Sequence, residues 1–189
     1  MNLAEALPDR PAPSLAAMPG ADSAERAAVL ALIAGFLAGI GLPLRRTELT
    51  GPTFLPGVDV IDGRLCYDPA RLAHPGDLLH EAGHLAVLAP EVRAAAQHDV
   101  GADGGYEMAA IAWSWAALVH LGLAPEWVFH RDGYKGEADM LLQAFRDGGG
   151  VGVPMLAWLG LTADPARPHD DGPVFPAMRR WLCEAAPGG

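Results

Sequence analysis

The sequence predicts an α+β fold that is mostly helical, formed by a single domain that follows a short leader. Apolar residues recur at three- and four-residue steps in segments 76–88 and 105–123, which is the spacing of long helices with a buried face. Two short strand-like runs flank Asp62-Gly63, a pair typical of a two-residue hairpin turn. The chain has 189 residues, of which 51% are apolar, so it is long enough to bury one sizeable core.

The N-terminal elements follow from local signals. Residues 1–22 hold four prolines and show no apolar period, which predicts a flexible leader before a domain of residues 23–189. Ser23 is a suitable N-cap for a helix that ends near Gly39 to Gly41. The runs 58–61 and 64–67 then predict a small antiparallel sheet.

Shorter helices are expected in the C-terminal part, at about 136–146, 154–160 and 174–185, between loops rich in Gly and Pro. A group of large aromatic residues is expected to fill the core. Its members are Trp113, Trp115, Trp127, Phe129 and Trp158.

Composition disfavours several classes of partner. The formal net charge is −10 and Lys135 is the one lysine, so neither nucleic acid nor an anionic membrane surface is an expected partner. Cys66 and Cys183 lack any metal or disulfide spacing, which favours free thiols in the cytoplasm. Residues 27–44 carry no charge and reach the length of a membrane span, but nearly half of them are Ala or Gly. A buried helix is therefore favoured over a membrane attachment for this segment. The sequence does not indicate the oligomeric state.

The chemistry centres on His80-Glu81-Ala82-Gly83-His84, an H-E-x-x-H pattern on the expected helix 76–88. Residues four apart differ by about 40° around a helix axis, so the two imidazoles project from one face and can bind a single Zn²⁺. Glu81 lies beside them as a candidate general base for an attacking water. The alternative is an ordinary polar helix face, which the apolar flanks of the motif disfavour.

A catalytic zinc site needs a third protein ligand. Glu107 is the preferred candidate, because it opens the helix at 105–123 with small and apolar residues on the same side. The alternative for Glu107 is a solvated carboxylate at a helix N-terminus. Asp103 is the main rival as a ligand, since the glycines around it allow a loop to bend toward the metal.

Peptide hydrolysis also requires a donor for the negative charge that develops on the carbonyl oxygen. His130 and Tyr134 lie in a loop between expected helices and are the preferred candidates. The alternative is that both are solvated loop residues.

The order of these features resembles the gluzincin type of zincin metallopeptidases, and most closely the ImmA/IrrE-type bacterial metallopeptidases. The resemblance spans residues 55–120: a hairpin, the H-E-x-x-H helix, and a helix that opens with Glu107. It implies a zincin-like core in which the hairpin packs beside the motif helix. It also implies that His80, His84 and Glu107 are ligands, that Glu81 is the general base, and that the edge strand receives an extended peptide.

The expected function is therefore that of a cytoplasmic, zinc-dependent metallopeptidase that acts on a peptide or protein substrate, with Glu81 as general base. Two alternatives remain. One is a non-catalytic protein-interaction module with a structural or vestigial metal site, and the other is a membrane-attached peptidase that uses residues 27–44.

Overall fold

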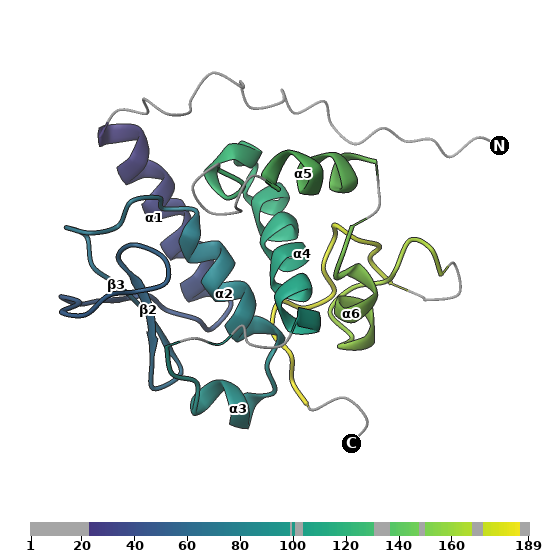
Figure 1. Cartoon of the computed structure of the whole chain (residues 1–189). Coiled ribbons are helices and arrows are strands. Elements are labelled where there is room, and N and C mark those ends of the chain that lie inside the picture. Colours follow the sequence, from purple (N-terminus) through teal and green to yellow (C-terminus); the bar gives the residue numbers. More distant parts are fainter. Residues whose placement is uncertain are drawn as a thin grey trace.

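Helices dominate the fold (Figure 1). The structure is a computed structural model that describes residues 23–98, 100, 104–130, 137–147, 150–167 and 172–185. The expected leader 1–22 lies outside this range. The helices are α1 (Ser23–Gly39), α2 (Asp77–Val87), α3 (Pro90–Ala94), α4 (Gly104–Leu121), α5 (Ala138–Arg146) and α6 (Val153–Trp158), with a 3₁₀ turn η1 (Pro125–Trp127). The strands are β1 (Arg45–Arg46), β2 (Val58–Ile61) and β3 (Arg64–Tyr67).

The sheet contains the expected hairpin. Strands β2 and β3 pair antiparallel, with Ile61 opposite Arg64, and both turn residues between them, Asp62 and Gly63, have positive φ. Such a turn twists in the same sense as the strands it joins. The sheet is nevertheless mixed, not purely antiparallel, because the two-residue strand β1 pairs parallel with β3 and places β3 in the centre.

Helix α2 lies at the centre of the molecule, packed against α4 and against β2, β3 and α1 (Figure 1). All its residues are buried, as expected of a helix that is apolar nearly all round. Its C-terminal end is held by Arg93, whose guanidinium donates hydrogen bonds to the main-chain carbonyls of Leu85, Leu88 and Cys183. The motif helix is therefore fixed on every side.

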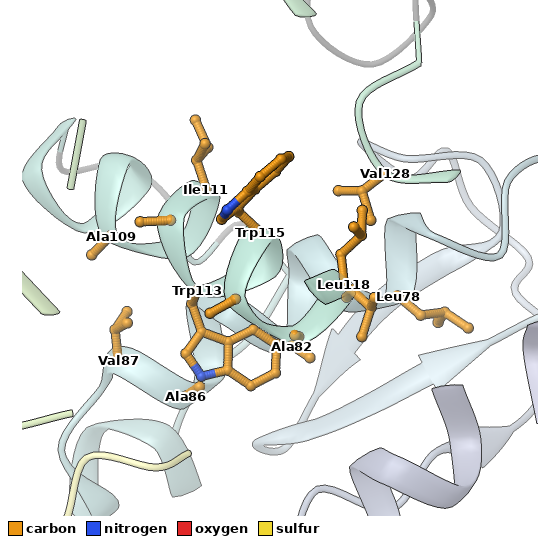
Figure 2. Packing of buried hydrophobic residues seen from close by; sticks show 14 of the residues in the cluster. Leu78, Ala82, Ala86, Val87, Ala109, Ile111, Trp113, Trp115, Leu118 and Val128 are labelled. Carbon is orange, nitrogen blue, oxygen red and sulfur yellow. The ribbon is translucent and has the colours of Figure 1, made fainter. Parts of the chain in front are cut away.

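The contact between α2 and α4 is the most extensive between two elements, and it is close. A Cβ atom on Gly83 would lie 2.7 Å from the carbonyl oxygen of Ala110, so only glycine lets the backbones approach this far. Figure 2 draws Trp113 of α4 in one cluster with Ala82 and Ala86 of α2. The small residues of α2 therefore leave room for the largest fully buried side chain.

The aromatic residues behave as expected with one exception. Trp113, Trp115, Trp127 and Phe129 are buried, but Trp158 at the end of α6 is 60% exposed. Most of this group therefore fills the core, whereas Trp158 contributes to the surface.

Segment 174–185 contains no helix, so the helix expected there is wrong. Its backbone N–H groups instead donate to other parts of the chain: Arg179 to the carbonyl of Leu161, and Cys183 to the carbonyl of Ala86. Trp181 also packs edge-on against Trp113 and accepts a hydrogen bond from its indole nitrogen. The segment is thus an irregular strap of turns and bends that contacts the end of α2.

The first helix, α1, has the expected start and end, and one of its faces is buried through Val29, Ile33 and Leu37. In the part of the chain that the structure describes, no helix combines the length and the hydropathy required to cross a bilayer. Cys66 and Cys183 are both free and buried, as expected.

Candidate metal centre

Three potential ligands converge where α2 crosses the first turn of α4. His80 Nε2 and His84 Nε2 are 3.2 Å apart. Glu107 Oε2 lies 3.2 Å from His84 Nε2, and Glu107 Oε1 lies 3.6 Å from His80 Nε2. These donors form the one group of this kind found among the described residues.

The spacing fits a tetrahedral zinc ion. Zn²⁺ binds nitrogen and carboxylate oxygen at about 2.0–2.1 Å, so neighbouring ligand atoms of a tetrahedron lie about 3.3–3.4 Å apart. The three observed separations, 3.2, 3.2 and 3.6 Å, fall close to that value. Three of four positions are thus supplied by described residues, which is the ligand number typical of a catalytic zinc site.

Protonation states also suit a metal. Burial, and secondly the neighbouring His84 ring, lower the pKa of His80 from 6.5 to about 4, so His80 is neutral at physiological pH. Neutral imidazole is the form that binds metal. Burial alone would raise the pKa of Glu107, but its hydrogen bond with His84 and the charge of the two rings hold it below 4.5. The set therefore offers the neutral imidazole of His80, the ring of His84 and one carboxylate.

Glu81 projects from another side of α2 than His80 does. It is buried on α2, and it lines a cavity of about 120 Å³ together with Asp59 of β2, His98 and Phe54. Glu81 follows His80 directly and therefore projects about 100° away from it around the helix axis. Glu81, the candidate base, therefore lies between the face of α2 that carries the ligands and a cavity beside β2.

His130 is held by a buried carboxylate. Its Nε2 lies 2.7 Å from Asp77 Oδ1, both residues are buried, and its ring stacks on His74 with the centroids 3.8 Å apart. Asp77 lies on α2, so the structure ties His130 to the helix that carries His80 and His84. Tyr134 and Asp103, the other two candidates, lie outside the described residues.

Two contributors, Asp77 and Asp59, were missing from the sequence analysis, and His98, one of several acidic and histidine residues downstream of the motif, was given no role there. Asp77 precedes His80 by three residues on one helix face, a spacing that is visible in the sequence. Asp59 and His98 are 39 residues apart, and no local pattern connects them. Both oxygens of Asp59 lie 3.1 Å from His98 Nδ1.

At Val60, the backbone groups on the open edge of β2 already have hydrogen-bond partners. Its carbonyl accepts a hydrogen bond from the His98 backbone N–H, and its own N–H donates to the Asp59 carboxylate. An extended peptide therefore cannot pair with Val60 without displacing these groups. The role that the resemblance implied for this edge strand does not fit the structure at that residue.

Comparison with models of known families, with curated proteins and with solved structures finds no match to this chain. The functional argument consequently rests on the residues of the site.

Proposed function

We propose that this chain is a zinc-dependent peptidase with a zincin-like core, in which His80, His84 and Glu107 hold the metal. The observation that carries the proposal is the convergence of the two imidazole Nε2 atoms with the two carboxylate oxygens of Glu107, at separations of 3.2–3.6 Å. An ordinary polar helix face does not require two buried imidazoles and a carboxylate at tetrahedral spacing.

Glu81 acts as the general base. When bound, the metal supplies a Lewis acid that polarises the scissile carbonyl and makes water a better nucleophile near neutral pH. Glu81 takes the proton of the attacking water and returns it to the leaving amine. Its position next to a cavity gives water and one part of a substrate access to the carboxylate.

The pair of His130 and Asp77 is the candidate for stabilising the carbonyl oxygen. Asp77 orients the ring through the contact at Nε2. A donor so oriented stabilises a developing negative charge without rearrangement during the reaction. Tyr134 remains the second candidate for this role.

The rival function is a protein-interaction module with a closed structural metal. A closed zinc site has four protein ligands, whereas three converge among the residues that the structure describes. The number of donors therefore favours catalysis.

The test measures zinc and turnover separately. Wild-type protein, Glu81→Gln and His84→Ala are loaded with zinc, dialysed, analysed for metal, and incubated with a peptide library that is read by mass spectrometry. Glu81→Gln is expected to keep one zinc per chain and to lose about 10²- to 10⁴-fold in turnover. His84→Ala is expected to lose the metal, and the exposed Glu91→Gln serves as a control that changes neither.

Three results contradict the proposal. Wild-type cleavage rates in Glu81→Gln would remove Glu81 from the mechanism. Stoichiometric zinc in dialysed His84→Ala would show that the ligands are wrongly assigned. A wild-type protein that binds zinc and cleaves no peptide would favour the interaction module.

A further inference from the structure

The cavity beside Glu81 is sized for the end of one side chain. Its volume of about 120 Å³ is somewhat below the roughly 150 Å³ of a cavity that holds one benzene ring. A whole peptide residue with its backbone does not fit in this space, but a few side-chain atoms do. The cavity adjoins the candidate base, so a side chain that enters it belongs to a residue near the bond that is cleaved.

Acidic groups dominate the polar wall of this cavity. Asp59 and Glu81 both line it, and His98 is its one basic residue among the described lining. The side chain of Asp59 is only 16% exposed, and the Val60 N–H and the His98 ring fix its carboxylate. The pocket therefore has a preformed wall in which two carboxyl groups face one imidazole.

His98 is itself held in place at the rim. Its backbone N–H bonds to the carbonyl of Val60, its Nδ1 faces Asp59, and its φ is +49°, an unusual conformation for a residue with a side chain. These contacts keep the rim of the pocket in one arrangement. Strained conformations of this kind persist where the surrounding structure over-determines them.

The remaining wall is apolar except for Thr53, whose hydroxyl is bonded to the backbone of Leu55 and Gly57. Pro52, Phe54 and Val58 line the cavity, and Phe54 is 81% exposed, a high value for a phenylalanine. An apolar wall next to a carboxylate suits a side chain with an aliphatic stem and a cationic end. The exposed ring of Phe54 adds a face on which such a cation can rest.

A second metal ion does not account for this cluster. Donor atoms of Asp59, Glu81 and His98 do not converge as a ligand group, and within the described ranges only His80, His84 and Glu107 do so.

We propose that this cavity is a substrate subsite that selects a basic side chain, lysine or arginine, on a residue adjacent to the scissile bond, with Asp59 as the residue that determines the specificity. This inference rests on the proposed peptidase function, because it assigns the pocket to a substrate of the same site. It adds a substrate class and a residue to that function.

The experiment compares three peptide series on zinc-loaded protein. Peptides that differ at one position next to the scissile bond carry lysine, norleucine or glutamate there, and kcat/KM is measured for each. The lysine peptide is expected to be preferred over norleucine by about tenfold, which corresponds to one hydrogen-bonded ion pair in a partly shielded pocket.

The decisive variant is Asp59→Asn. Asparagine keeps the size of the side chain and the oxygen that accepts from the Val60 N–H, so the strand is retained while the charge is lost. The ratio of kcat/KM for lysine over norleucine is expected to fall to about one in this variant. Asp62→Asn is the matched control: it removes the same charge from the turn of the same hairpin, outside the cavity, and asparagine tolerates its positive φ.

The outcomes separate the two proposals. Cleavage of all three series without a preference for lysine overturns the subsite and leaves the peptidase intact. A lysine preference that Asp59→Asn retains, or that Asp62→Asn also abolishes, overturns the role of Asp59. Absence of cleavage in every series overturns the peptidase function and the subsite together.

Discussion

Replacing Gly83 by alanine tests how the metal centre is assembled. Gly83 lies between the two histidine ligands on α2, and a Cβ at this position would point at the backbone of Ala110 on α4. Glu107 stands on α4 one turn before Ala110, so a shift of that helix moves the third ligand relative to the other two. The substitution leaves every donor atom chemically unchanged.

The size of the shift follows from the structure. The added Cβ would meet the Ala110 carbonyl oxygen at 2.7 Å, whereas a comfortable carbon–oxygen contact begins at about 3.3 Å, so the backbones must separate by about 0.6 Å. Zinc–ligand distances tolerate deviations of about 0.2 Å. The displacement exceeds this tolerance, and we expect the Kd for zinc to rise by about tenfold or more.

Folding stability is expected to change less than metal affinity. Alanine is favoured over glycine inside a helix by about 1 kcal/mol, while overpacking a core costs about 1–3 kcal/mol, so the free energy of unfolding of the zinc-free protein falls by about 0–2 kcal/mol. Zinc affinity is measured by competition with a chromophoric chelator, and stability by urea unfolding of the metal-free protein.

Gly35→Ala provides the matched control. Gly35 lies inside α1 with nothing within 4 Å of its would-be Cβ, so this variant is expected to gain about 1 kcal/mol of stability and to bind zinc as the wild type does. Unchanged zinc affinity in Gly83→Ala would refute the reasoning, since it would mean that the close approach of α2 and α4 does not position Glu107.

The remaining predictions concern stability. Because His80 has a pKa of about 4 in the fold and 6.5 when unfolded, the unfolded chain binds more protons, and the zinc-free protein loses about 3 kcal/mol as the pH falls from 6.5 to 4. Urea unfolding at several pH values measures this loss, and a flat profile between these limits would contradict the burial of a neutral imidazole. Arg93→Met removes the donor of three main-chain carbonyls and is expected to lower the free energy of unfolding by about 3 kcal/mol. The exposed Arg167→Met should stay within about 0.5 kcal/mol in the same denaturant titration, and equal values for both variants would argue against this anchoring of α2.

Elements defined by local signals were predictable. The hairpin follows from Asp62-Gly63, whose residues accept positive φ, and the bounds of α2 and α4 follow from apolar periodicity between glycine and proline residues. The strap 174–185 was not predictable, because its N–H groups find partners on Leu161 and Ala86, far away in the sequence. Strand β1 was missed for a related reason: two exposed arginines carry no alternation of apolar and polar residues.

The candidate site likewise contains residues that local spacing predicts and residues that only the folded chain brings together. His80, Glu81 and His84 are related by helix geometry alone, so their spacing was sufficient to group them. Glu107 required a choice among several acidic residues, and its place in the group depends on the crossing of α2 and α4. The pairing of His130 with Asp77 joins residues 53 positions apart, so only the folded chain shows it.

The complete burial of α2 bears on how a bound ion would be exchanged. A helix that is enclosed on all sides cannot fray by itself, so its amide protons reach solvent only when the layers around it separate. Loss of either histidine ligand is then inseparable from opening of the core. Glu107 differs, since its side chain is 33% exposed against 9% and 5% for His80 and His84. Of the three candidate ligands, Glu107 is therefore the one that solvent reaches while the core stays closed, so an ion that enters the folded protein would meet this carboxylate first.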